Sequence, residues 1–218
     1  VSESVFIAGG DGEYSIRWFT PTKELALVGH ATLAAAQVVL SVLEPDRSEV
    51  QFISPISGQL AAYRDEANVA IVLPADDPVA SEPPAALIQG LGRTPVSTLK
   101  GRHYVAVCDD PEKVAALEPK FDVLETLDLP TIAVTARGNE SDYVLRFFAP
   151  ANGVPEDPVS GVAQCSLMPY WASKLARAEL TSRQLSPKGG EMNCKMLDEG
   201  VQIAGPCCTI FSGVLENC

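Results

Sequence analysis

Residues 16–22 read I-R-W-F-T-P-T, and residues 145–151 read L-R-F-F-A-P-A. Each stretch leads to a glycine that opens an apolar run, Gly29 in the first copy and Gly161 in the second. Further matching positions follow in the same order: Gly58 with Gly190, Val69 with Val201, Ile71 with Ile203, and Pro74 with Pro206. Solenoid and propeller repeats have periods of roughly 20–50 residues, and this repeat is longer. The chain is therefore predicted to hold two homologous domains related by a pseudo-two-fold axis.

Strand signals dominate the sequence, because short runs of β-branched and apolar residues are separated by turn residues. The predicted strands are 4–7, 14–20, 50–54, 59–64, 69–73, 104–108, 131–136, 143–148, 192–196, 201–203 and 208–215. Two apolar segments, 30–43 and 161–176, are predicted to be helices, and shorter helices are expected at 85–91, 111–117 and 121–127. A helix that is apolar nearly all round must be enclosed on most sides. The predicted fold class is therefore α+β, with each half a barrel-like, mainly antiparallel sheet around a central helix.

The domain boundary is expected near Gly92, after the polar, proline-rich segment 74–84. The first domain then comprises residues 1–92 and the second residues 93–218, with the last strand returning to the first domain. A long stretch of chain precedes the R-F-F-A-P segment of the second copy, whereas only residues 1–16 precede the R-W-F-T-P segment of the first copy. We therefore expect the first domain to lack N-terminal strands that the second domain has.

Composition excludes several classes of function. The net charge of −12 argues against nucleic acid and anionic membranes as partners, and no apolar run approaches the roughly 20 residues that span a bilayer. The six cysteines form no C-x-x-C pair, and the two histidines do not complete a zinc site. We expect free thiols in a cytoplasmic protein, with Cys207 and Cys208 buried in an apolar strand.

Two glycines at predicted helix starts are candidate binding groups. The first N–H groups of a helix lack internal partners, and the helix dipole adds partial positive charge there, so an anionic group binds well. Gly29 with His30, and Ser160 with Gly161, are expected to face each other across a cleft between the two domains. A purely structural role remains the alternative for each glycine, since helix starts are commonly capped without binding anything.

Four ionisable residues, His30, Asp157, Glu3 and His103, have either a functional or a structural interpretation. His30 lies at a predicted helix start, where a neutral ring is favoured; the alternative is a capping or core histidine. Asp157 is placed at the equivalent position of the second half, and the alternative is an acidic residue that merely favours the helix dipole. Taken alone, Glu3 reads as a solvated side chain and His103 as a structural residue at a strand edge.

Together these segments resemble the phenazine-biosynthesis (PhzF-like) isomerase family over essentially the whole chain. The resemblance rests on segments that occur in one order: S-E-S-V-F from Ser2, R-W-F-T-P-T from Arg17, G-H-A-T-L-A from Gly29, R-F-F-A-P from Arg146 and E-D-P-V-S-G from Glu156. It implies a diaminopimelate-epimerase-like fold of two pseudo-symmetric domains, with the site between them. It also leaves room for a homodimer.

The resemblance implies catalysis by proton transfer without a metal or organic cofactor. In the family's phenazine-pathway member, a glutamate moves a proton between carbons of a dihydro-hydroxyanthranilate. That glutamate corresponds to Glu3, the expected general acid/base. His30 and Asp157 would orient and polarise a small anionic substrate, and Gly29, Ser160 and Gly161 would bind it, the two glycines through their backbone N–H groups.

Two departures from the family pattern concern the substrate. The family usually has G-S-A-H after the second glycine, where this chain has Gly161, Val162, Ala163 and Gln164. Val162 removes a hydroxyl group and Gln164 removes a titratable group. We therefore expect a substrate other than the phenazine intermediate.

Two alternative functions stay open. An amino-acid epimerase or racemase of the same fold would place a cysteine beside each helix-end glycine, but Val28 and Pro158 stand at those positions. A metabolite-binding or protein-interaction module that has kept the fold without catalysis is the second alternative. Glu3, His30 and Asp157 favour the enzyme, and Val162 and Gln164 favour the binding module.

Overall fold

The computed structural model describes residues 3–65 and 68–214 and shows a mixed α+β protein. The chain divides into two compact units. The first contains the residues up to Ile71 together with those from Ala204 onward, and the second is Val72–Ile203. Gly92, where the domain boundary was predicted, ends helix α2 (Ala85–Leu91) inside the second unit.

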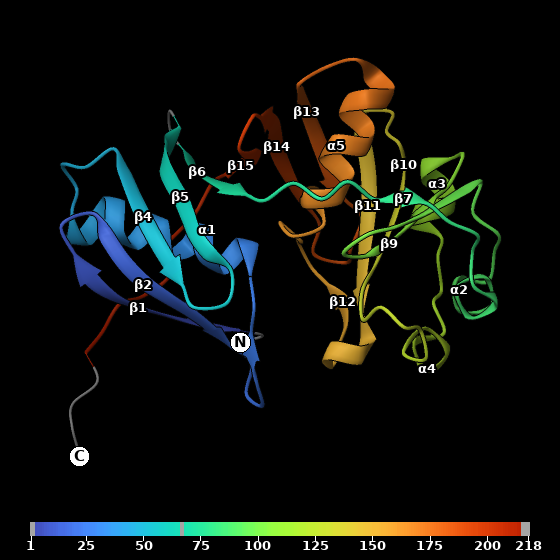
Figure 1. Ribbon diagram of the computed structural model, residues 1–218, viewed down its shortest axis with the longest axis horizontal. Coiled ribbons are helices and arrows are strands. Elements are labelled where there is room, and N and C mark those ends of the chain that lie inside the picture. Colours follow the sequence, from blue (N-terminus) through green and yellow to red (C-terminus); the bar gives the residue numbers. More distant parts are fainter. Residues whose placement is uncertain (1–2, 66–67, 215–218) are drawn as a thin grey trace. The chain divides into compact units, whose positions relative to one another are not determined.

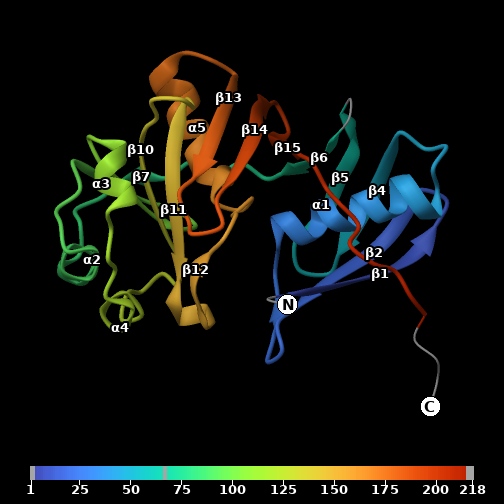
Figure 2. The same ribbon diagram turned by 180° about the vertical axis from the view of Figure 1, so that it is seen from behind.

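The first unit is a sheet with one long helix against a face (Figures 1 and 2). Its strands, in spatial order, are β1 (Ser4–Gly10), β2 (Glu13–Phe19), β4 (Glu49–Ser54), β5 (Gly58–Asp65) and β6 (Asn68–Leu73), with the short β3 (Glu24–Leu25) paired to β2. Only β2 and β4 run parallel, because helix α1 (Gly29–Val38) connects them. The small side chains Ala31, Ala35 and Ala36 are buried on this helix and allow it to lie close to the sheet.

The second unit has a larger sheet, and helices lie against it (Figure 1). Its strands, in spatial order, are β15 (Gly200–Gly205), β14 (Gly190–Leu197), β13 (Glu179–Gln184), β11 (Tyr143–Ala149), β10 (Ile132–Arg137), β9 (Tyr104–Val107), β8 (Ser97–Lys100) and β7 (Val79–Ala80), with β12 (Val154–Asp157) paired to β11. Helix α5 (Gln164–Leu175) packs against β13 and β14. Helices α2, α3 (Pro111–Ala115) and α4 (Phe121–Leu124) cover a core that includes Leu87, Val114 and Leu124.

The internal repeat is present as one motif built twice. Strands β1, β2, β4 and β5 have the same order and directions as β10, β11, β13 and β14. In both copies the helix follows a short strand that pairs with the motif's central strand, and Phe19 opposite Glu24 corresponds to Phe148 opposite Glu156. Beyond β10 the second unit continues with β9, β8 and β7, whereas the described part of the first unit ends at β1. The two sheets are therefore unequal.

Several predicted elements are corrected by the structure. Neither sheet closes into a barrel within the described residues. Strand β1 is a free edge of the first unit's sheet, and β7 is a free edge of the second unit's sheet. The predicted helix 30–43 changes into a π-helical turn at Val39–Leu43, where the Glu44 N–H donates to the Val39 carbonyl (2.8 Å). The predicted strand 208–215 is absent from the described residues 206–214, because Ile210 and Phe211 are exposed and no described strand pairs with that segment.

The structure describes five of the six cysteines, and all five are free. Cys108, Cys165 and Cys194 are free and buried, while Cys207 is half-buried and Cys208 is exposed. The expected burial of the Cys207–Cys208 pair in a strand is therefore wrong, and Cys218 lies outside the described residues. Strands at 97–100, 154–157 and 179–184 were not predicted from the sequence.

Candidate active site

Glu3 and His30 form a direct pair in the first unit. Glu3 lies immediately before β1, and His30 is the second residue of α1. The Nε2 atom of His30 lies 3.2 Å from Oε2 of Glu3, and the two side chains are 39% and 11% exposed, respectively. A mostly enclosed carboxyl group beside a reachable imidazole can take a proton from a small molecule and return it. His30 is thus neither an isolated core residue nor a helix cap, since α1 has no side-chain cap.

The start of α1 offers unused hydrogen-bond donors beside this pair. The residue before the helix, Val28, provides no side-chain cap, and the first turn contains no acidic residue. The Thr32 N–H is the first donor that is satisfied, by the Val28 carbonyl at 3.0 Å. The N–H groups of Gly29, His30 and Ala31 have no partner among the described residues. The positive end of the helix dipole is therefore not compensated by any described side chain or carbonyl.

Asp157 lies in the second unit at the end of β12, opposite Phe147 of β11. Its Oδ1 atom accepts a hydrogen bond from the Val159 N–H (3.2 Å). Its main chain is tied to the end of β13, where the Gln184 side chain donates to the Asp157 carbonyl (2.5 Å) and accepts from the Ser160 N–H (2.7 Å). Gln184 is a residue that the sequence analysis missed, because a glutamine in a strand carries no chemical signal of its own.

Gly161 begins a turn rather than a helix, which corrects the predicted start of the second helix. The Gln164 N–H donates to the Gly161 carbonyl (3.1 Å) and the Cys165 N–H to the Val162 carbonyl (3.2 Å), so the first bonds are of the three-residue type. Helix α5 therefore begins at Gln164. Within the described chain, the N–H groups of Gly161 and Val162 have no partner. Ser160 is buried, and its hydroxyl oxygen accepts from the Ala163 N–H (3.4 Å).

His103 has a structural role, as the sequence analysis expected, but it acts on this turn. Its Nε2 lies 3.3 Å from the Val162 carbonyl, its Nδ1 lies 2.5 Å from the Thr131 hydroxyl, and its ring meets Phe147 edge to face. Because a carbonyl can only accept, Nε2 must carry the proton and Nδ1 accepts from Thr131. Burial lowers the pKa of His103 to about 4, so the ring is neutral at physiological pH.

The structure revises the equivalence assumed between His30 and Asp157. Trp18 lies opposite Leu25 in the first unit, and Phe147 lies opposite Asp157 in the second. Leu25 is therefore the repeat equivalent of Asp157. Val162 is the equivalent of His30, since each follows its glycine directly.

Gln164 occupies the interior instead of the surface of the turn. Its side chain is fully buried, and its Oε1 accepts from the Tyr143 hydroxyl (2.5 Å). Tyr143 in turn stacks on Trp171, with the ring centres 5.9 Å apart. Gln164 is thus a buried residue bonded through its oxygen, while its Nε2 has no partner among the described residues. Val162 is half-buried.

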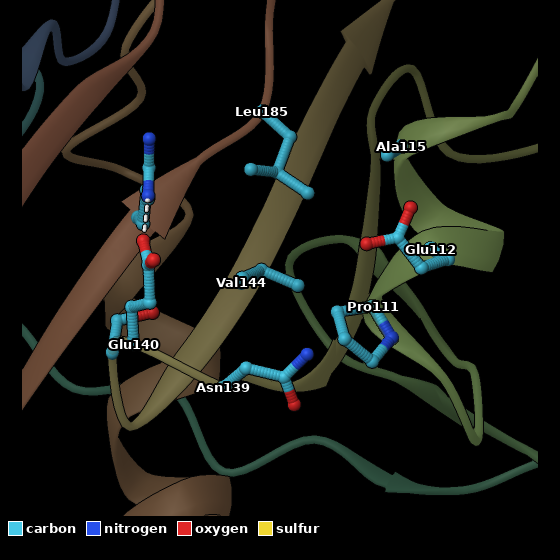
Figure 3. A pocket seen from close by; sticks show the side chains of 9 residues that line it. Pro111, Glu112, Ala115, Asn139, Glu140, Val144 and Leu185 are labelled. Carbon is cyan, nitrogen blue, oxygen red and sulfur yellow. Dashed lines mark hydrogen bonds and ion pairs between the residues drawn. The ribbon is translucent and has the colours of Figure 1, made fainter.

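A surface cavity of ≈ 320 Å³ lies elsewhere in the second unit (Figure 3). Glu112 of α3 and Asn139 border it, Val144 and Leu185 supply apolar walls, and Glu140 is bonded to Arg183. Arg183 and Gln184 are neighbours on β13 with exposed and buried side chains, so the cavity lies on the opposite side of this strand from the Gln184 contacts. None of the predicted site residues lines it.

The predicted site residues thus form two local groups. Glu3, Gly29 and His30 belong to the first unit, and Asp157, Ser160 and Gly161 to the second. Among the described residues, no cluster of histidine, cysteine or acidic side chains could hold a metal ion. In that same part of the chain, no helix is both long and apolar enough to cross a membrane.

Comparison with known proteins gives one consistent result. The model of the phenazine biosynthesis-like protein family (PhzC-PhzF) matches residues 1–213. An uncharacterized isomerase of Pseudomonas aeruginosa is 42% identical over 214 residues, which cover 98% of this chain and 82% of that protein. The crystal structure of a putative phenazine biosynthesis PhzC/PhzF protein from Clostridium difficile has a TM-score of 0.90 at 32% identity, covering 100% of this chain and 84% of that one.

A second solved structure, a PhzF-family protein from Enterococcus faecalis, has a TM-score of 0.89 at 35% identity and covers 94% of this chain and 79% of its own. The repeat, the two matching glycines Gly29 and Gly161 and the Glu3–His30 pair are therefore found in a chain whose relatives share its fold. The chain belongs to the phenazine biosynthesis-like (PhzF) protein family.

Proposed function

We propose that this protein is an isomerase that moves a proton between atoms of a small carboxylated metabolite, with Glu3 as the general acid/base. The observation that carries the proposal is the contact of 3.2 Å between Glu3 and His30 beside the open start of α1. The carboxyl group takes the proton, and its partial burial protects the transfer from bulk water. This chemistry needs no metal or organic cofactor.

The backbone donors supply the second element of the proposed mechanism. When a proton leaves a carbon next to a carbonyl or carboxylate, negative charge develops on oxygen. Fixed N–H groups, such as those of Gly29 and His30, stabilise that charge without reorganising. We assign the N–H groups of Gly161 and Val162 and the Asp157 carboxylate to substrate binding.

Val162 supports a substrate other than the phenazine intermediate. It places an isopropyl group where the family usually has a serine hydroxyl, so this position offers shape instead of a hydrogen bond. The described cysteines argue against a two-thiol epimerase, because Cys165 and Cys194 are buried and burial raises their thiol pKa values to about 12 and about 11. A homodimer and a cytoplasmic location remain predictions.

The test is deuterium incorporation into substrate in D₂O, followed by mass spectrometry on a panel of small carboxylated metabolites. Glu3→Gln keeps the shape of the side chain but cannot take the proton, so we expect exchange to be abolished and ligand affinity to stay within about a few-fold. The matched control is Glu13→Gln, an exposed carboxylate of the same unit, which should exchange like the wild type. Full exchange in Glu3→Gln would assign the proton to another group, and affinity without exchange in the wild type would favour the binding module.

A further inference from the structure

The Gln184 side chain holds both ends of the segment that carries Asp157. Both polar atoms of its amide are bonded: the nitrogen donates to the Asp157 carbonyl (2.5 Å), and the oxygen accepts from the Ser160 N–H (2.7 Å). The side chain is buried, so water does not compete for these bonds. A second side chain that follows β13 also holds this segment: the Ser186 hydroxyl donates to the Pro158 carbonyl (2.6 Å).

These bonds restrict the groups that the proposed function uses. The direction of the Asp157 carbonyl determines how the Asp157 side chain is oriented. Ser160 directly precedes Gly161, whose N–H group is proposed to bind the substrate. Asp157 also closes its own turn through the Val159 N–H (3.2 Å). A rotation at the Asp157 carbonyl would therefore move the carboxylate, and a rotation at the Ser160 N–H would move the adjacent Gly161 donor.

Among the described residues, the amide bridge of Gln184 is specific to the second copy of the repeat, whereas the hydroxyl contact recurs in the first copy, where Ser57 donates to the Ala26 carbonyl (2.5 Å). The last residue of β13, Gln184, lies opposite Gly190, and the last residue of β4, Ser54, lies opposite Gly58. Ser54 instead accepts from the Ile56 and Ser57 N–H groups of its own turn, at 3.3 and 3.1 Å. The first copy therefore ends its strand without an amide bridge, and the bridge of Gln184 is an addition of the second copy at the segment that carries Asp157.

We propose that Gln184 is a positioning residue, which presents Asp157 and the Gly161 N–H group to the substrate by bridging the Asp157 carbonyl and the Ser160 N–H. This inference rests on the proposed function for its effect on turnover. The bridge itself is a physical statement that can be tested without any substrate.

The first arm measures hydrogen exchange of the 157–163 backbone in the substrate-free protein. Gln184→Met keeps the volume of the side chain and removes both bonds, so the Ser160 amide should exchange about tenfold faster or more. Gln184→Leu, which also removes the acceptor for the Ser160 N–H, is the second variant if the first does not fold. The control is Gln51→Met on β4, whose side chain bonds only to Gln59 at 3.3 Å, and it should leave exchange in 157–163 unchanged. Unchanged exchange in both Gln184 variants would overturn the bridge.

The second arm is a double-mutant cycle on kcat/KM with Asp157→Asn. Gln184→Met should lower kcat/KM by about 10–100-fold, because small misplacements of binding groups are costly, and should lower it no further in the Asp157→Asn background. A merely structural role would give additive losses, and those would overturn action through Asp157, as would undiminished kcat/KM with raised exchange. If the wild type turns over no metabolite while the first arm succeeds, the proposed function fails and the catalytic role of Gln184 with it, but the bridge stands.

Discussion

Replacing Glu156 by glutamine should destabilise the second unit much more than replacing Glu24 destabilises the first. Both carboxylates form the same bidentate pair, Arg146 with Glu156 at 2.7 and 2.8 Å and Arg17 with Glu24 at 2.8 and 2.7 Å. The repeat thus supplies two copies of one interaction in different surroundings. The Arg146 and Glu156 side chains are 10% and 14% exposed, whereas those of Arg17 and Glu24 are 53% and 27% exposed.

Burial sets the size of the effect. Removing one partner of a buried pair costs about 3–5 kcal/mol, because the remaining charge is left uncompensated. The Arg146 guanidinium keeps one good acceptor, the Leu117 carbonyl at 2.7 Å, so we expect the lower end, about 3 kcal/mol of unfolding free energy. An exposed pair is screened by water, so Glu24→Gln should leave the unfolding midpoint of the first unit nearly unchanged.

Each unit contains one buried tryptophan, Trp18 in the first and Trp171 in the second, which allows the two to be followed separately. Urea unfolding monitored by fluorescence would use a Trp171→Phe background for the first unit and a Trp18→Phe background for the second. Equal losses in the two units, or a loss below about 1 kcal/mol for Glu156→Gln, the range of exposed pairs, would refute the argument from burial.

Two further predictions concern buried groups. His103 has a pKa lowered from 6.5 to about 4, so the unfolded state binds the proton first on acidification. At 1.36 kcal/mol per pKa unit, His103 contributes at most about 3 kcal/mol to the unfolding free energy. This contribution is present above pH 6.5 and is lost as the pH falls toward about 4. The wild type should therefore lose stability relative to His103→Gln over that range in urea unfolding, and parallel pH profiles would contradict this. Iodoacetamide should modify exposed Cys208 in the native protein but reach buried Cys165 and Cys194 only on unfolding. Peptide mass spectrometry would show this, and simultaneous modification of all three would count against the buried placement.

The repeat, most strands and the start of α1 could be predicted from the sequence, because local patterns determine them. The R-W-F-T-P and R-F-F-A-P segments fall on β2 and β11, which hold matching places in their sheets. Helix 85–91 was predicted with the bounds that the structure shows. The assignment of Glu3 and His30 to one site came from the family resemblance, since nothing in their spacing brings them together.

What escaped prediction depends on contacts between distant residues. The Gln184 bridge joins a strand to a turn 24 to 27 positions away in sequence. The assumed equivalence of Asp157 with His30 failed because strand register, which aligns Asp157 with Leu25, cannot be read from one strand alone. The apolar run at 208–214 has the composition of a strand, but composition does not supply a neighbouring strand to pair with.

The register of the repeat has a consequence for stereochemistry. The positions equivalent to His30 and Asp157 are Val162 and Leu25, so neither of these two ionisable groups recurs in the other copy of the motif. Enzymes that invert a carbon centre place a base on each face of the substrate, one to remove the proton and another to deliver it. With Glu3 as the single acid/base of the proposed mechanism, the proton would return to the face from which it was taken. We therefore expect a suprafacial shift that relocates a double bond, with retention and not racemisation at any centre that exchanges.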